Sequence, residues 1–517
     1  MIKKIKSLII FMVLILLLTA CGGHDNTSGE TDLPIEEIEQ KLVIGVGRDF
    51  YEGPASPTYL HGSTNVWESL TYLDDQLEPM PQLAESWSVS EDGKTWRFDL
   101  REGVFFHDGT PFNAEVAAYN LERLLNHPRK GNTKLTYGDI TNIEVVSEYA
   151  LEITHEVPMP EFPRMVAYHD GAMFSLAAFD ENNDIVAPIG TGPFVFQEYI
   201  ADQSIILVKN ENYWGNTPIL EEVIFAFIAD PNTRLAALQS GEVDALSDVG
   251  AVMPEQAIII EENNDLILKT KLVGTTHYLF FNQNNLFKDN NLLQAVSYAL
   301  NRQLLVDTVL EGYGIPGESV ITPVAVNWLN KGVAPVYNMD KARELVEEAL
   351  KGKEAEVKLL LHSGISSRWP YKAIAEIMQH ELSELNLIID IEMVDAGEWA
   401  KRLQEGNYDI TIGPFTLMTG EPNVFFSTHM FSEGNLNKSR SYGYNNSQVD
   451  ELITKAAVER DADKRREMYL QLQEIASTEG PVVPIYHDVT LYAVNKKVNN
   501  FELDVNFKPH LGMVEIK

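Results

Sequence analysis

The stretch SEDGKTWRFDLREGVFFHDGTPF, residues 90–112, carries the pattern that decides the fold. Its two Asp-Gly pairs predict tight turns, because such pairs tolerate the backbone conformations that these turns need. Apolar and charged side chains alternate over residues 96–100, which is the period of a half-buried strand. Asn113 then predicts the start of a helix over residues 114–125, whose apolar side chains recur at helical spacing.

The same two periods recur along the rest of the chain. Residues 42–44 predict a strand, and residues 295–300 and 342–350 predict helices. Strands and helices interleave irregularly, so we expect mixed α/β domains. A chain of 517 residues exceeds one ordinary hydrophobic core, which indicates two or three domains.

The composition excludes one class of partner. The formal net charge is −36 and the hydrophobic fraction is 44%, which is normal for a globular protein. A chain with this acidic surplus has no basic surface to neutralise phosphates, so we expect no nucleic-acid partner.

The first residues predict a targeting segment. Lys3, Lys4 and Lys6 precede an apolar run over residues 8–18, which is too short to span a bilayer. Cys21 is the only cysteine and follows Leu-Thr-Ala, which resembles a bacterial lipobox. We therefore expect a signal peptide over residues 1–20, lipidation of Cys21 and a flexible tether over residues 21–40. The alternative is an ordinary signal peptide followed by a free thiol.

Several segments, taken together and in order, resemble one family. They are residues 90–112, residues 188–194 (PIGTGPF), residues 210–215 (NENYWG) and residues 295–302 (AVSYALNR). This series is similar to the extracytoplasmic solute-binding proteins of the peptide/nickel family, which are receptors of ABC importers. Within it, we interpret Gly190 and Gly192 as a turn that needs unusual dihedral angles.

The resemblance implies an α/β, two-lobed periplasmic-binding-protein fold of the class II type. Lobe I would span residues 42–271 and 485–517, with an extra subdomain inserted at about 68–186, and lobe II would span 272–484. Solute would bind between the lobes and stabilise their closed arrangement. The implied partners are an ABC permease and its ATPase subunits, and the receptor itself would be a monomer at the outer face of the cell membrane, held by its lipid.

The solute is the open question. Peptide receptors of this family usually carry a Trp near an Asp-Pro pair in the second lobe. Here Glu421-Pro422 stands at that place and the Trp is absent, which weakens a general peptide interpretation. A neutral imidazole suits nickel, and nickel-type members of the family capture the metal as a chelate.

The resemblance to nickel-type members implies four metal ligands from distant segments: His61, His169, His429 and His487. Each has a plainer interpretation as a loop, surface or packing residue. The segments contain no His-x-x-x-His pattern, so any metal site must be assembled by the fold.

A chelate with carboxylates also needs cationic and apolar neighbours. The resemblance implies Arg129 as the carboxylate partner, with Arg164 as a second candidate. Tyr59, His277 and Met418 are further candidates for ligand contact, although Met418 also suits core filling. We therefore expect nickel bound with a small chelator such as histidine, and no catalytic cofactor; the alternative is an oligopeptide receptor.

An enzyme is the competing class. The chain has no Gly-x-Ser-x-Gly elbow and no His-Glu-x-x-His motif, and lipidation would consume its one cysteine. We expect a binding protein and not an enzyme.

Overall fold

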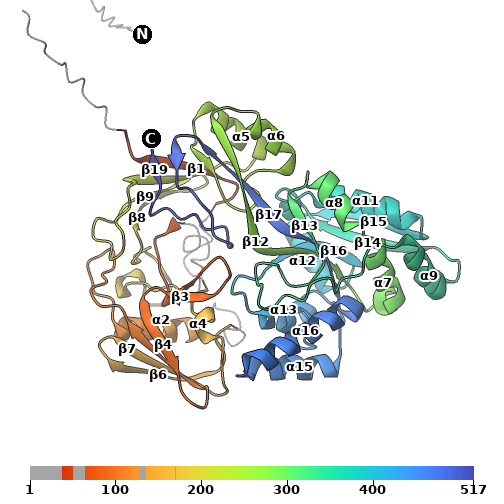
Figure 1. Ribbon diagram of the computed structural model, residues 1–517, viewed down its shortest axis with the longest axis horizontal. Coiled ribbons are helices and arrows are strands. Elements are labelled where there is room, and N and C mark those ends of the chain that lie inside the picture. The colour runs from red at the N-terminus through yellow and green to blue at the C-terminus, as the bar shows by residue number, and fades with distance from the viewer. Residues whose placement is uncertain (1–37, 50–63, 127–135, 169–170) are drawn as a thin grey trace, which may run out of the picture. The chain divides into compact units, whose positions relative to one another are not determined.

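A computed structural model describes residues 38–49, 64–126, 136–168 and 171–517. Within these residues the main sheet has eleven strands, ordered β15-β14-β16-β12-β17-β11-β1-β10-β9-β8, with β13 paired to β17 (Figure 1). The strands of this sheet are β1 (Lys41–Val46), β8 (Phe194–Ile200), β9 (Ser204–Lys209), β10 (Glu222–Phe227), β11 (Ala245–Leu246), β12 (Leu266–Phe281), β13 (Gly314–Pro316), β14 (Ala355–His362), β15 (Leu387–Val394), β16 (Ile410–Thr416) and β17 (Val482–Asn495).

Two long antiparallel strands, β12 and β17, join the two lobes. Leu266 of β12 and Leu491 of β17 pack in a core of the first lobe, whereas Leu279 and Ile485 pack in a core of the second. Their pairing shifts register between Leu272 and Thr276, and such irregularities bend a strand locally. The exact lobe boundaries predicted above stay a prediction.

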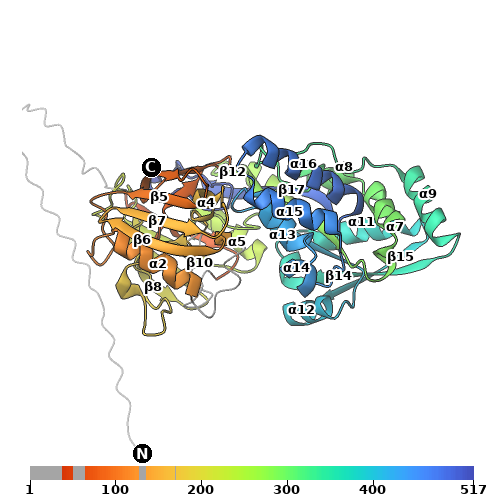
Figure 2. The same cartoon turned by 90° about the horizontal axis from the view of Figure 1, so that it is seen from below.

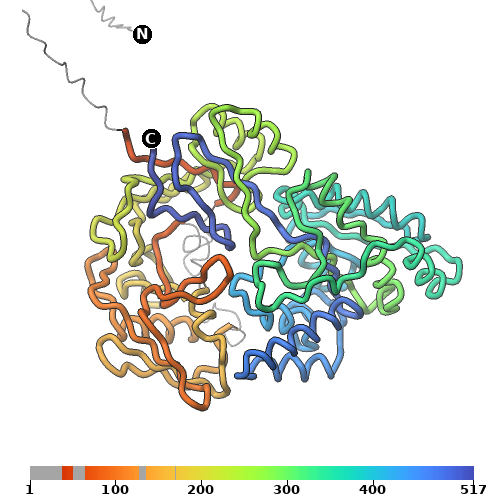
Figure 3. Tube along the Cα trace, in the orientation of Figure 1, coloured from red at the N-terminus to blue at the C-terminus, as the bar shows by residue number. Residues whose placement is uncertain are grey.

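The first lobe is built from both ends of the described chain. β1 runs parallel to β10 and β11, and β11 pairs with β17. Gln40 Nε2 donates a hydrogen bond of 2.9 Å to the carbonyl of Ile516, so the C-terminal segment returns to β1 (Figure 3). Other elements of this lobe are β18 (Val498–Asn499), β19 (Glu515–Ile516), η2 (Leu176–Ala178), α5 (Pro231–Ser240), η3 (Pro254–Gln256) and α6 (Ala257–Glu261).

A four-stranded antiparallel sheet, ordered β4-β5-β7-β6, forms a separate core in the first lobe (Figure 2). The predicted strand is β5 (Thr95–Leu100), and the predicted helix is α2 (Ala114–Asn126), with Asn113 Oδ1 accepting from the amide of Val116. Gly93 and Gly109 have φ of 77° and 82°, which confirms the two predicted turns. The remaining elements of this region are β2 (Thr71–Leu73), β3 (Pro79–Pro81), β4 (Ala84–Val89), β6 (Ile140–Ser147), β7 (Ala150–His155) and α4 (Phe162–Met165).

The prediction of unusual dihedral angles at Gly190 and Gly192 was wrong. Neither residue has a positive φ. Instead the backbone passes so close to residues 65–67 that a Cβ on Gly190 would lie 2.2 Å from the carbonyl oxygen of Val66. Glycine is needed here for close approach and not for a left-handed conformation.

Helices of the second lobe pack around β14, β15 and β16 and around the end of β12. The helix predicted over 295–300 lies in α7 except for Leu300, which is extended, and the helix predicted over 342–350 lies in α9. The helices are η4 (Leu286–Lys288), α7 (Asn290–Ala299), α8 (Arg302–Val309), α9 (Met339–Leu350), α10 (Ser363–Ser366), α11 (Tyr371–Ser383), α12 (Ala396–Gln404), α13 (Pro422–His429), α14 (Asn435–Ser439), α15 (Ser447–Val458) and α16 (Ala462–Glu479). Of the helices in the described ranges, none has the length and apolar character needed to cross a membrane.

Candidate functional site between the lobes

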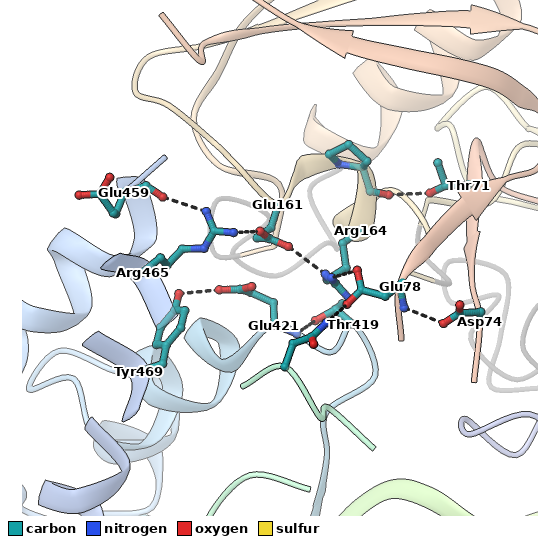
Figure 4. Close-up of polar contacts among 12 residues, drawn as sticks. Thr71, Asp74, Glu78, Glu161, Arg164, Thr419, Glu421, Glu459, Arg465 and Tyr469 are labelled. Atoms are coloured by element: carbon teal, nitrogen blue, oxygen red, sulfur yellow. Dashed lines mark hydrogen bonds and ion pairs between the residues drawn. The ribbon is translucent and has the colours of Figure 1, made fainter. Parts of the chain in front are cut away.

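The first lobe contributes an arginine held between two carboxylates. Glu161 precedes α4, and the single helical turn places Arg164 beside it, so that Arg164 Nε donates to Glu161 at 2.9 Å. Arg164 Nη2 also donates to Glu78, at 2.8 Å, next to β3 (Figure 4). Burial alone would lower the pKa of Arg164, but the carboxylates of Glu161 and Glu78 outweigh it and raise that pKa. The guanidinium is therefore permanently charged.

The second lobe contributes residues at the starts of two helices. Glu421 precedes α13, and Arg465 and Tyr469 lie one turn apart on α16. The Tyr469 hydroxyl donates a hydrogen bond of 2.5 Å to Glu421 Oε1. Arg465 Nη1 donates to the carbonyl of Glu459 at 2.8 Å, and the guanidinium lies 5.3 Å from the centre of the Trp328 ring. These contacts hold Arg465 in one orientation.

Polar contacts join the two sides. Arg465 Nη2 forms an ion pair with Glu161 Oε1, so Glu161 contacts an arginine of each lobe (Figure 4). Asn327 Nδ2 donates to Glu78 at 3.0 Å. We call Glu78, Glu161, Arg164, Glu421, Arg465 and Tyr469 the interlobe cluster.

An apolar contact accompanies these polar ones. Leu77 belongs to the first lobe, yet its side chain is fully buried in a core otherwise built mainly from the second lobe. A Cβ placed on Gly420 would lie 2.6 Å from the Leu77 Cβ and 3.0 Å from Arg164 Nη1. The two lobes thus approach each other to van der Waals contact at this point.

The interlobe cluster has one carboxylate more than it has guanidinium groups. Glu421 is 4% exposed and its Oε2 has no protein donor within the described residues. Burial, together with the Glu161 carboxylate, raises the pKa of Glu421 to about 7, while Tyr469 and the two arginines act in the opposite direction. Because an unpaired buried charge is costly, the site favours either a proton or a cationic group at Glu421.

A cavity of about 460 Å³ adjoins the interlobe cluster. Its walls come from both lobes. They include the cluster residues Glu161, Arg164 and Arg465 and the rings of Trp87, Trp96 and Trp328.

The structure separates the predicted histidines that it describes. The His277 ring stacks on Tyr486 with centroids 4.1 Å apart, and His487 Nδ1 shares a hydrogen bond of 2.8 Å with Thr276 Oγ1. Thr276 of β12 pairs with His487 of β17, so these two side chains share one face of the sheet. His277 is the next residue of β12 and faces the opposite side, so His277 and His487 lie on opposite faces. His429 packs instead against the rings of Phe280 and Phe425.

These three imidazoles are fully buried and uncharged near neutral pH. Burial, with the neighbouring charge of Arg440, lowers the pKa of His429 to about 3. Burial, with His277 and Arg302, lowers the pKa of His487 to about 3. Burial also lowers the pKa of His277, although Asp488 lies 3.5 Å from its Nε2. Across the described ranges, no group of three or more His, Cys, Asp or Glu side chains could hold a metal ion.

The other predicted residues divide into two sets. Arg164 belongs to the interlobe cluster, and Met418 is half-buried two residues before Gly420, with its carbonyl accepting from Asn506 Nδ2 at 3.0 Å. Outside the described residues lie Cys21, Tyr59, His61, Arg129 and His169.

Sequence reasoning missed most of the interlobe cluster. Arg465 stands in a run of three basic residues that is typical of a solvated helix face. The signal that would have found it is its spacing from Tyr469, Leu472 and Ala476, which are all buried on α16.

Comparison with known proteins identifies the class. Residues 78–437 match the family described as "Bacterial extracellular solute-binding proteins, family 5 Middle". The chain belongs to this family of extracytoplasmic receptors, which work with an ABC permease and ATPase. Among its relatives, the Haemophilus influenzae Heme-binding protein A is 27% identical over 81% of each chain. The Escherichia coli K12 Glutathione-binding protein GsiB is 28% identical over 92% of this chain and 90% of its own.

Solved structures share the two-lobed fold. Staphylococcus aureus NikA, in complex with Ni(L-His)2, has a TM-score of 0.77 and 23% identity and covers 92% of this chain and 100% of its own. Helicobacter pylori DppA, in complex with the peptide STSA, has a TM-score of 0.77 and 22% identity over 92% of this chain and 98% of its own. Brucella suis NikA, in complex with Fe(III)-EDTA, has a TM-score of 0.83 and 22% identity over 92% and 100%. Identities this low support the common fold and leave the solute open.

Proposed function

We propose that this receptor captures a solute with a protonated amino group, most simply a short peptide, and delivers it to an ABC permease. The observation that carries this proposal is Glu421, a buried carboxylate that sits in a cluster with surplus negative charge and whose Oε2 has no donor among the residues that the structure describes. An ammonium group supplies a positive charge that balances the surplus carboxylate and N–H donors for Glu421 Oε2. The relatives named for glutathione and the solved complex with STSA support the same solute class.

A nickel–histidine complex is the second candidate. The imidazoles of His429 and His487 are neutral, as a metal ligand requires, and His429 Nε2 has no hydrogen-bond partner in the described residues. The S. aureus relative solved with Ni(L-His)2 supports this candidate. One argument disfavours the nickel complex. An amino nitrogen bound to nickel carries no ammonium charge, so the chelate neutralises the Glu421 carboxylate less well than a free ammonium group does.

The proposal extends to location and assembly. Lipidation of Cys21 would hold a monomeric receptor at the outer face of the cell membrane, beside its permease and ATPase. The family match to extracellular solute-binding proteins supports the extracytoplasmic side.

Calorimetry on the Cys21→Ser protein tests the solute. The probes are trialanine, N-acetyl-trialanine, L-histidine alone, and nickel chloride with two equivalents of L-histidine. We expect trialanine to bind and its acetylated form to lose at least about tenfold in affinity, because acetylation removes the charge-assisted hydrogen bonds. If only the nickel–histidine mixture gives binding heat, and neither trialanine nor L-histidine does, the peptide proposal is wrong and the nickel proposal takes its place.

Two variants sharpen the test. Glu421→Gln keeps the shape of the side chain and removes its charge, so trialanine affinity should fall. The matched control is Glu68→Gln, since Glu68 is equally buried but its oxygens already accept from Thr191, Tyr213 and Trp214. Equal losses in both variants would contradict a specific role for Glu421.

A further inference from the structure

We propose that Glu161, Arg465 and the Leu77–Gly420 contact form a latch that holds the two lobes closed even in the absence of solute. This goes beyond the proposed function, because it concerns how long the closed form lasts and not what it binds. The latch residues come from elements far apart in sequence and meet only where the lobes meet. Figure 4 shows the Glu161–Arg465 pair.

Glu161 is suited to this role because it serves both lobes at once. Its Oε2 accepts from Arg164 of its own lobe, and its Oε1 accepts from Arg465 of the other. Its side chain is 15% exposed, and those of Arg164 and Arg465 are 4% and 6% exposed, so the ion pairs are largely shielded from solvent and salt. Opening the lobes would separate Arg465 from Glu161 and expose both to water.

Arg465 is prepared for the contact before closure. Its Nη1 bond to Glu459 and its packing on Trp328 both lie within the second lobe. The guanidinium therefore needs little reordering when Glu161 arrives, which reduces the entropic cost of the contact.

The apolar half of the latch depends on a missing side chain. Leu77 has a positive φ of 60°, which is unusual for leucine, and its buried side chain lies against Gly420. A methyl group on Gly420 would meet Leu77 at 2.6 Å, a distance that Cβ contacts do not reach. Alanine at position 420 should therefore prevent full closure.

The test measures the distance between lobes directly. Spin labels are placed at Asn182→Cys in the first lobe and Lys353→Cys in the second, both exposed, in the full chain with Cys21→Ser. Double electron–electron resonance then gives the distance distribution without any solute. We expect Glu161→Gln and Gly420→Ala each to move population toward longer distances.

Matched controls separate the latch from general damage. Gly332→Ala has the same backbone strain as Gly420→Ala, with φ of 71° against 72°, but meets no atom within 4 Å, so its distribution should equal that of the parent. The double variant Glu161→Gln/Arg465→Gln should shift the distribution no further than Glu161→Gln alone, because the two residues act as one pair. Thermal melting is recorded for every variant, to confirm that each is folded.

Unchanged distributions in both Glu161→Gln and Gly420→Ala would overturn the proposal. A shift in Gly420→Ala alone would overturn the part assigned to the ion pair.

Discussion

Tyr469 donates a 2.5 Å hydrogen bond to one oxygen of the Glu421 carboxylate, while the other oxygen has no donor from the described protein. The same carboxylate is therefore anchored on one side and unsatisfied on the other. This half-satisfied state explains why burial can raise the pKa of Glu421 to about 7 even with two arginines close by.

The first prediction concerns the stability of the protein against pH. The pKa of Glu421 is about 7 when folded and 4.5 by its ordinary value, so the folded protein holds the extra proton between these limits. Stability from this group is present at low pH and is lost as pH rises from about 4.5 to 7. Glu421→Gln should remove that loss. Between pH 5 and pH 8 the unfolding free energy of the variant should therefore rise by about 1–3 kcal/mol relative to that of the parent. Urea unfolding at the two pH values measures it, and parallel curves for parent and variant would contradict it.

The second prediction concerns solute binding against pH. An ammonium group needs Glu421 ionised, so trialanine affinity should rise as pH increases toward about 7. Above about pH 8 the affinity should fall again, because the α-amino group of trialanine loses its own proton. Tyr469→Phe removes a hydrogen bond that favours the ionised form of Glu421 and should move this rise to higher pH. Calorimetry from pH 5.5 to 8.5 follows it; an identical profile in Tyr469→Phe would argue that Glu421 is not the titrating group.

The third prediction concerns acid unfolding. The pKa of His429 is about 3 when folded, against an ordinary value of 6.5, so the stability due to neutral His429 is lost as pH falls below 6.5. At pH 5 this loss amounts to about 2 kcal/mol relative to pH 7. His429→Leu should shrink the difference in unfolding free energy between these pH values. A difference in the variant equal to that of the parent would show that His429 is not held neutral.

The fourth prediction concerns the close backbone approach in the first lobe. Gly190→Ala would place a methyl group against the Val66 carbonyl, which is backbone and cannot rotate away. We expect a loss of about 3 kcal/mol or more in unfolding free energy. Gly512→Ala is the control, since a Cβ there meets nothing within 4 Å. A loss below about 1 kcal/mol at Gly190 would mean that residues 65–67 can move aside.

The fifth prediction concerns the expected lipid. Cys21→Ser should abolish incorporation of radiolabelled fatty acid, because the Cys21 thiol is the group that we expect to be acylated. It should leave the melting temperature of the folded body unchanged. Label remaining on the variant would place the lipid elsewhere.

Local features of the fold could be predicted from sequence, and contacts between distant segments could not. β5 and α2 follow from side-chain period and from the Asn113 cap, which act over a few residues. The pairing of Glu161 with Arg465 spans 304 residues and depends on how two lobes meet. No side-chain period or sequence motif indicates that these two residues form a pair.

The candidate site shows the same limit for single residues. The sequence marks His429 and His487 as possible ligands by residue type alone. Whether an imidazole faces a cleft or a packed core depends on the register of β12 with β17 and on the rings around α13. Glu421 was visible as a departure from an Asp-Pro pair, but its unsatisfied oxygen depends on which neighbours the fold supplies.

The shared construction of the first lobe has a consequence for how the chain folds as it is made. β1 pairs with β11, and β11 pairs with β17, which lies near the C-terminus. Gln40 donates a hydrogen bond to Ile516, so the sheet of this lobe remains incomplete until the last residues emerge. Most of the second lobe is a continuous segment whose contacts are shorter in range, and such segments fold earlier. An exported chain would therefore wait for its own C-terminus with the β17 side of β11 unpaired, and a chaperone that shields this strand edge during that interval should raise the yield of folded protein.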